Sequence, residues 1–508
     1  MRVFDRKRNP AAAESKTCAC QLVRVSKNLM ADKIGPLSLL LLVIAAAVAM
    51  LPLESSMKVE WVRSSMADDR TEHELLVLLG RAEADPMTNT TDVVVAPAPE
   101  RSNFPDPINY VLWINVSGFR GDYVEKSNAP FFGNLSLASA STSRMSPTSP
   151  SLNWPSLVSM ATGLKPAQHG IIGETIRLPE SGEIVRRPTD LSLLKGEPIW
   201  TTAKRQGVRV LVQDWPFSQI QPSENAADIH LAEFDPEASD ADRLKALMDA
   251  WTSDTDEEKI RLAMVSLHDL NKVGEKHGAR APETYTAFTD FDTQMAEFFT
   301  QLEEAWPKLN RGADELWVFI TTDHGMAEVE TLINYEQLVS QQVQDRTVVA
   351  IDDTVAHIWL NLPDGTNQEK FLKAMDDELG RPIFWKMYTP DQMPADWDFP
   401  ADGGGAGERI LVLQPKYRFT DKKGSEAVFP AVEVGGPLAT GGYAVKATSV
   451  MRGQAFIFKF PERADVVDLK NIYSVQLYPT VCKLLGIEPA EGADAAALEL
   501  GPAEMVEE

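Results

Sequence analysis

The chain has 508 residues, of which 44% are hydrophobic and 24% charged, which is enough apolar material for one large globular domain or two medium ones. Its formal net charge of −25 repels phosphate backbones and argues against a nucleic-acid-binding protein. Of its three cysteines only Cys482 lies in the large domain, which excludes a disulfide within that domain.

The N-terminal part has the pattern of a membrane anchor. Residues 1–33 are basic, and residues 34–53 carry no charge and have about the length that a helix needs to cross a bilayer. The positive-inside rule then predicts a single-pass type II protein with 1–33 in the cytoplasm and the large domain exoplasmic, in the secretory pathway or at the cell surface. Two alternatives remain: a cleaved signal peptide, and a mitochondrial presequence that leads to the inner membrane.

Residues 54–107 end in a proline-rich piece and are expected to form a stalk or linker. From 108 to 486, β-rich runs alternate with amphipathic stretches, which indicates an α/β sheet. The clearest strands are Tyr110–Val116, Val208–Val212, Arg261–Leu267, Glu315–Thr321 and Ala455–Phe460, and the clearest helices are Trp154–Thr162 and Ala287–Glu304. We expect an inserted lobe in 340–440 and a solvated acidic tail at 487–508.

Four stretches stand in a fixed order along the large domain: residues 112–120, 155–171, 197–204 and 322–326. The first reads Leu-Trp-Ile-Asn-Val-Ser-Gly-Phe-Arg and the last Thr-Asp-His-Gly-Met. Together they resemble the nucleotide pyrophosphatase/phosphodiesterase family of the alkaline phosphatase superfamily. The resemblance implies a mixed sheet between helices, with the site at the carboxyl ends of the strands. It also implies two zinc ions held by Asp and His, and a Thr nucleophile that attacks a phosphodiester or pyrophosphate.

Several positions depart from what the resemblance implies. Ser117 stands where a metal-binding Asp is expected, and Asn153 holds the position of the nucleophile, although an amide is a poor nucleophile. Asn271 and Glu275 replace an Asp and a His of one metal, and Gly441 replaces its other His. The catalytic site is therefore not intact.

Two metal-binding positions are retained, Asp323 and His324, and two ligands alone are expected to hold zinc weakly. At the position of a phosphate-binding Asn stands Glu174, whose carboxylate is expected to repel a phosphate. The position of an aromatic residue that stacks on the nucleobase is Trp154, which plain core packing explains equally well. No resident cofactor is expected. The alternative is one divalent cation (Mg, Ca or Zn) at Asp323 and His324, with Ser117 and Asn153 completing the set.

Three other histidines are possible metal ligands. A shifted register would bring His268, Asp269 and His277 in as substitute ligands, which we do not favour because Gly274 fixes the register. We expect His169 to tie down backbone in its loop rather than to bind metal.

The leading hypothesis is a membrane-anchored pseudoenzyme that acts as a binding or scaffolding module. Residues 34–53 would anchor it in the membrane, and its protein partner or small-molecule ligand is unknown. The alternatives are a diverged metal-dependent hydrolase of phosphodiesters or pyrophosphates, and a structural subunit of a membrane complex. Because the nucleophile and most metal ligands are replaced together, the inactive form is favoured over an enzyme.

Overall fold

The computed structural model describes residues 107–501 apart from 179, 220, 223, 232–233, 313, 395–396, 400–404, 425, 443–449 and 462–465. The predicted anchor at 34–53 and nearly all of the predicted stalk lie outside these residues. In the described part, no helix combines the length and the apolar character that a bilayer crossing requires.

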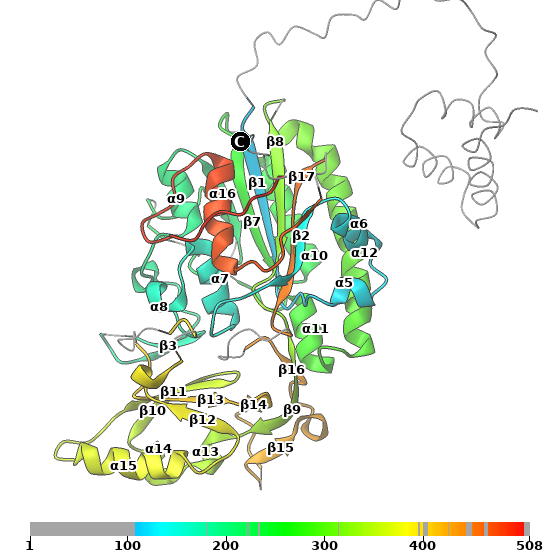
Figure 1. Cartoon of the computed structure of the whole chain (residues 1–508). Coiled ribbons are helices and arrows are strands. Elements are labelled where there is room, and N and C mark those ends of the chain that lie inside the picture. Colours follow the sequence, from blue (N-terminus) through cyan, green and yellow to red (C-terminus); the bar gives the residue numbers. More distant parts are fainter. Residues whose placement is uncertain are drawn as a thin grey trace, which may run out of the picture. The chain divides into compact units, whose positions relative to one another are not determined.

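An eight-stranded mixed sheet forms the centre of the molecule, in the order β18-β2-β17-β8-β1-β7-β5-β6 (Figure 1). Its strands are β1 Asn109–Val116, β2 Ala140–Met145, β5 Arg209–Gln213, β6 Ile229–Leu231, β7 Ile260–Leu267, β8 Glu315–Thr321, β17 Gly453–Phe460 and β18 Val467–Asp468. β1 lies parallel to β7 and β8, whereas β17 runs antiparallel to β8 and β2. The predicted mixed α/β architecture is confirmed.

Helices cover both faces of this sheet. One face packs against α7 (Asn153–Thr162), α9 (Ile199–Arg205) and α16 (Leu477–Leu485), and the other against α6 (Pro130–Ser136), α10 (Asp240–Ser253) and α12 (Pro282–Leu309). Alternate residues of β1 enter the two cores: Val111 and Trp113 one, Leu112 and Ile114 the other. A strand covered on both faces needs such a continuous apolar run.

Helix α12 is longer than the sequence predicts. It begins with Pro282 at its first turn and ends at Leu309, beyond Pro307 in the last turn. Proline interrupts the hydrogen-bond ladder of a helix, which favours an earlier end. Burial of Trp306 and Leu309 outweighs that loss.

The segment that was expected to be an inserted lobe holds a second, four-stranded antiparallel sheet, in the order β10-β11-β13-β12. Its strands are β10 Thr347–Asp352, β11 Val355–Leu360, β12 Trp385–Tyr388 and β13 Arg409–Leu413, and α13 (Tyr335–Leu338), α14 (Gln341–Gln344) and α15 (Gln368–Leu379) accompany it. A third sheet pairs β9 (Ala327–Ile333) with β14 (Lys416–Phe419), β15 (Val428–Pro430) and β16 (Ala439–Thr440). The short remaining elements are α5 Tyr123–Lys126, α8 Pro166–His169, α11 Asp269–His277, β3 Thr175–Arg177 and β4 Ile184–Arg186, with single 3-10 turns at Leu191–Leu193, Pro390–Gln392, Ala431–Val434 and Ser474–Gln476.

Part of the acidic tail packs on the molecule. Ile487, Ala493 and Leu498 are buried in the same core as α16. The tail thus touches the core at three points, while its acidic side chains Glu488, Glu491, Asp494 and Glu499 are exposed to solvent.

Candidate active site

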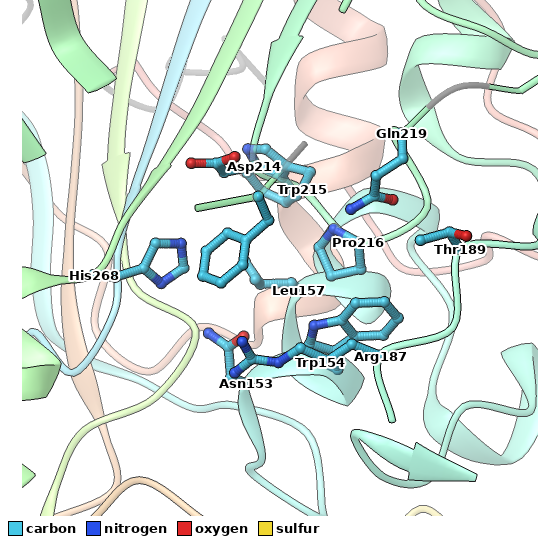
Figure 2. Close-up of a pocket in the computed structure, with 11 residues that line it drawn as sticks. Asn153, Trp154, Leu157, Arg187, Thr189, Asp214, Trp215, Pro216, Gln219 and His268 are labelled. Atoms are coloured by element: carbon cyan, nitrogen blue, oxygen red, sulfur yellow. The ribbon is translucent and has the colours of Figure 1, made fainter. Parts of the chain in front are cut away.

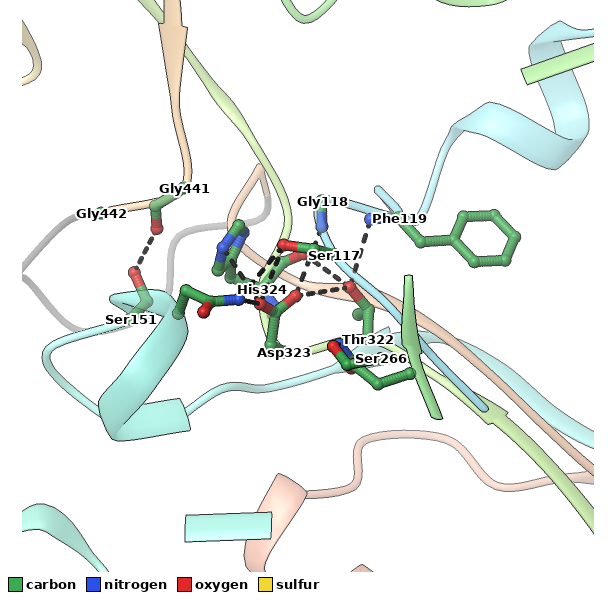
Figure 3. A network of polar contacts seen from close by, with 12 residues as sticks. Ser117, Gly118, Phe119, Ser151, Ser266, Thr322, Asp323, His324, Gly441 and Gly442 are labelled. Atoms are coloured by element: carbon green, nitrogen blue, oxygen red, sulfur yellow. Dashed lines mark hydrogen bonds and ion pairs between the residues drawn. The ribbon is translucent and has the colours of Figure 1, made fainter. Parts of the chain in front are cut away.

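The fold gathers four of the singled-out side chains at one edge of the central sheet. Ser117 follows β1, Asp323 and His324 follow β8, and Asn153 is the first residue of α7. Strands β1 and β8 are parallel neighbours, so their carboxyl ends open at the same edge. Figure 3 shows Ser117, Asp323 and His324 turned toward one another there.

The Asp323 carboxylate is fully buried and accepts hydrogen bonds on both of its oxygens. Its Oδ2 receives the Ser117 hydroxyl at 2.9 Å and the Asn153 amide nitrogen at 2.5 Å. Its Oδ1 receives the backbone N–H groups of Gly118 at 3.3 Å and His324 at 3.0 Å. Donors of this kind compensate a buried carboxylate without any cation.

The imidazole of His324 occupies the space beside Gly441. Its Nδ1 lies 2.7 Å from the carbonyl oxygen of Gly325, and its Nε2 lies 3.3 Å from Oδ2 of Asp323. A Cβ atom on Gly441 would come within 2.0 Å of the His324 ring. The Gly441 carbonyl in turn accepts the Ser151 hydroxyl at 2.9 Å. Position 441 therefore offers neither a ligand nor room for one while the ring lies there.

Helix α11 carries Asn271 and Glu275, the other two positions that the resemblance assigns to metal ligands. Oε1 of Glu275 lies 3.5 Å from Nη1 of Arg418, whose Nη2 contacts Asp353 at 2.5 Å. Burial raises the pKa of the Glu275 carboxyl, and the Arg418 charge opposes that rise. Oδ1 of Asn271 is buried and has no hydrogen-bond partner among the described residues.

The two metal sets implied by the resemblance fit these residues differently. The first set, now Asn271, Glu275 and Gly441, does not fit a metal, because it offers one carboxylate that already faces a guanidinium. The second keeps Asp323 and His324 and fits only in part, since its other members are a hydroxyl and an amide. No group of three His, Cys, Asp or Glu side chains able to hold a metal occurs among the residues that the structure describes.

The alternative ligand set His268, Asp269 and His277 does not come together. Asp269 accepts the backbone N–H of Asp240 and pairs with a lysine, and His277 ends the helix that Asp269 begins. His169 behaves as expected: its Nε2 bonds the Ser159 hydroxyl at 2.9 Å, and its Nδ1 accepts the N–H of Ile171. Burial lowers the pKa of His169 to about 3, which suits a neutral structural ring.

Glu174, which the resemblance places at a phosphate-binding position, lies against two arginines. Its Oε2 lies 3.1 Å from Arg186 and 3.0 Å from Arg187, and its side chain is 12% exposed. The two guanidinium groups therefore reduce the repulsion that the Glu174 carboxylate would exert on a phosphate.

A cavity of about 370 Å³ adjoins Asn153 (Figure 2). Its wall combines aromatic rings with polar and charged groups; it comprises Asn153, Trp154, Leu157, Arg187, Thr189, Asp214, Trp215, Pro216, Gln219, Phe234 and His268. Trp154 is 6% exposed and meets Phe217 edge-on at 5.3 Å, so it both packs in the core and forms part of the wall. The Arg187 guanidinium lies 5.2 Å from the Phe234 ring centre.

Sequence reasoning missed two parts of this region. Trp215 and Pro216 follow β5, and their place at the carboxyl end of a parallel strand was the available signal. Arg418 and Asp353 carried no such signal, because neither belongs to a motif and their partner lies far away in the chain.

Comparisons with known proteins agree with this architecture. The family described as Type I phosphodiesterase / nucleotide pyrophosphatase matches residues 111–443, about two thirds of the chain. A Schizosaccharomyces pombe protein named as an uncharacterized pyrophosphatase/phosphodiesterase is 25% identical over 313 residues, which cover 57% of this chain and 60% of that protein. Human ectonucleotide pyrophosphatase/phosphodiesterase family member 1 is 25% identical over 43% of this chain, but only 23% of its own length is spanned. Human family member 5 is 24% identical over 74% of each chain.

Solved structures show the same fold. Murine ectonucleotide pyrophosphatase/phosphodiesterase 5 superposes with a TM-score of 0.62 at 20% identity, covering 75% of this chain and 96% of that one. The human counterpart gives a TM-score of 0.63 at 21% identity, with 78% and 97% covered. On the length of the family match and the shared fold, the chain belongs to the type I phosphodiesterase/nucleotide pyrophosphatase family.

Proposed function

We propose that this chain is a membrane-anchored, catalytically inactive member of its family that acts as a binding or scaffolding module. The observation that carries the proposal is the Asn153 amide, which stands at the nucleophile position and donates its N–H to Asp323. A side chain without a nucleophilic atom cannot accept a phosphoryl group. The same contact also uses the lone pairs with which Asp323 would bind a metal.

Activity and metal content test this proposal together. The full chain, solubilised from membranes, is assayed with a chromogenic nucleotide phosphodiester in the presence of zinc, magnesium or calcium, and its bound metals are measured by elemental analysis. We expect no turnover above the blank and no stoichiometric metal. Metal-dependent turnover that disappears in Asp323→Ala would contradict catalytic inactivity.

The membrane anchor is a separate part of the proposal. Its support is the uncharged stretch 34–53 behind a basic segment, and the printed names of several relatives, which begin with ecto. The full chain should stay with membranes during alkaline extraction, and its large domain should resist protease in sealed microsomes. Release of a shortened chain into the lumen would instead indicate a cleaved signal peptide.

A nucleotide is the first ligand to try in the cavity beside Asn153. A solved structure of the murine relative is an inactive variant in complex with AMP. In this chain, Trp154, Trp215 and Phe234 give the cavity flat apolar surfaces that suit a planar ring. Titration calorimetry of the full chain with AMP is expected to show binding that Phe234→Ala weakens at least about tenfold.

One observation favours the alternative of a diverged hydrolase with a single divalent cation. The buried Oδ1 of Asn271 lacks a partner among the described residues and lies near Gly118, one residue from Ser117. An unsatisfied carbonyl-type oxygen is a suitable ligand for magnesium or calcium. Calcium- or magnesium-dependent turnover that Asn271→Leu abolishes would support this alternative over the inactive form.

A further inference from the structure

Two negatively charged side chains lie close together in the region of Glu275, and their charge has to be compensated. Glu275 on α11 and Asp353 in the turn between β10 and β11 are two partly buried carboxylates in one region. Two carboxylates placed together repel each other unless a cation lies between them.

Here the positive charge comes from the chain itself. Arg418 extends from β14, and its side chain is only 14% exposed. Nη1 lies 3.5 Å from Oε1 of Glu275, and Nη2 lies 2.5 Å from Oδ1 of Asp353. Nη1 also donates to the carbonyl oxygen of Ala439 at 3.3 Å. The guanidinium thus faces three oxygen atoms that come from three different segments.

This cluster joins the retained half of the site through β16. The Thr440 hydroxyl donates to Oδ2 of Asp353 at 2.7 Å, and the next residue is Gly441, against which the His324 ring lies. Arg418, Asp353 and Thr440 therefore form a continuous polar path from Glu275 to the edge of the Asp323 group. Burial lowers the pKa of Arg418, but the carboxylates of Asp353 and Glu275 raise it by more, so the charge is permanent.

We propose that Arg418 is an internal cation that substitutes for the first metal ion and fastens α11 to the β10–β11 turn. The proposal deepens the proposed function, because it explains why the fold needs no metal at this place. A guanidinium fixed by two carboxylates excludes a second cation, since like charges at this separation repel strongly.

The test is a titration of the full chain with Mn²⁺, in which the free ion is counted by electron paramagnetic resonance. Arg418→Gln removes the positive charge and leaves both carboxylates, so we expect this variant to gain one Mn²⁺ site. Its affinity for Mn²⁺ should be at least about tenfold higher than that of any wild-type site that depends on Glu275. Arg418→Lys keeps the charge and is the matched control, expected to behave like the wild type. Equal Mn²⁺ binding by folded Arg418→Gln and wild type would overturn the proposal.

A double-mutant cycle gives an answer even if Arg418→Gln folds poorly. Arg418→Gln leaves two unpaired carboxylates, whereas Arg418→Gln with Glu275→Gln removes one charge of each sign. We expect the double variant to melt at a higher temperature than Arg418→Gln alone. Additive changes in Tm would overturn the internal-cation role.

The outcome is independent of the activity assay. Turnover by the wild type would refute catalytic inactivity. If Glu275→Gln left that turnover unchanged, the role of Arg418 as the internal cation would still stand. Conversely, Mn²⁺ binding by the wild type that Glu275→Gln removes would overturn the role of Arg418, whether or not the protein is active.

Discussion

The two groups of polar residues that the family resemblance would assign to metal ions, one around Asp323 and one around Glu275, balance their charges in different ways. Around Asp323, a single buried carboxylate is compensated by the hydroxyl of Ser117, the amide of Asn153 and backbone N–H groups. Around Glu275, two carboxylates are compensated by the guanidinium of Arg418. The first arrangement depends on hydrogen bonds and the second on net charge, so the two should respond differently to substitution, salt and pH.

The largest effect is expected from Asp323→Ala. It removes the buried acceptor of the Ser117, Asn153 and backbone donors, and we expect a loss of about 2–4 kcal/mol in the free energy of unfolding. Urea denaturation measures it, and Asp323→Asn, which keeps one acceptor oxygen, should lose less. A loss under about 1 kcal/mol would show that the carboxylate is not a structural centre.

Arg418→Gln should cost less, about 1–2 kcal/mol, because its partners keep some contact with water. Since this arrangement rests on charge, 1 M NaCl should reduce the loss in free energy of unfolding that Arg418→Gln causes. The loss caused by Asp323→Ala should hardly change with salt. Denaturation at low and high salt compares the two. An equal salt response would remove the distinction between the regions.

The pH dependence near the second region can be predicted from Asp352. Burial raises its pKa to about 7, the hydrogen bonds from Thr175 oppose the rise, and the charge of Glu174 adds to it. Between about pH 4 and pH 7 the folded chain therefore holds a proton that the unfolded chain has lost, so stability falls as pH rises through this window, by at most about 1.4 kcal/mol per pH unit.

Asp352→Asn is the variant that tests this titration. It should flatten the pH profile of unfolding between pH 4 and 7, because an amide does not titrate. Asp249→Asn, an exposed carboxylate on α10, serves as the control that should leave the profile unchanged. An unaltered slope in Asp352→Asn would show that this carboxyl titrates normally.

Asn153→Thr should have the smallest effect on stability, under about 1 kcal/mol, because a hydroxyl can still donate to Asp323. It restores a nucleophile of the expected type, yet we expect no turnover, since Gly441 and Glu275 provide no working first metal set. The chromogenic assay with added zinc measures it. Activity regained by this single change would mean that only the nucleophile had been lost.

The strands of the central sheet could be predicted from sequence because each is a short apolar run with local periodicity, as in β1 and β8. The Asp323 group could be placed as well, since motif residues at the ends of parallel strands meet at one edge. The Arg418 pair could not, because an ion pair between β14 and α11 leaves no local pattern. The end of α12 was placed too early, at Glu304, because burial of Trp306 and Leu309 in the tertiary structure extends the helix further.

The contact between Gly441 and the His324 ring also limits how a metal ligand could be introduced at position 441. A side chain introduced at 441 meets the ring first, so that change alone strains the site before it adds a ligand. His324 would have to turn away beforehand, and its present place is held by the carbonyl of Gly325. Any side chain at 441 is thus disfavoured by the neighbouring ring, and a ligand could be introduced there only after a change at His324.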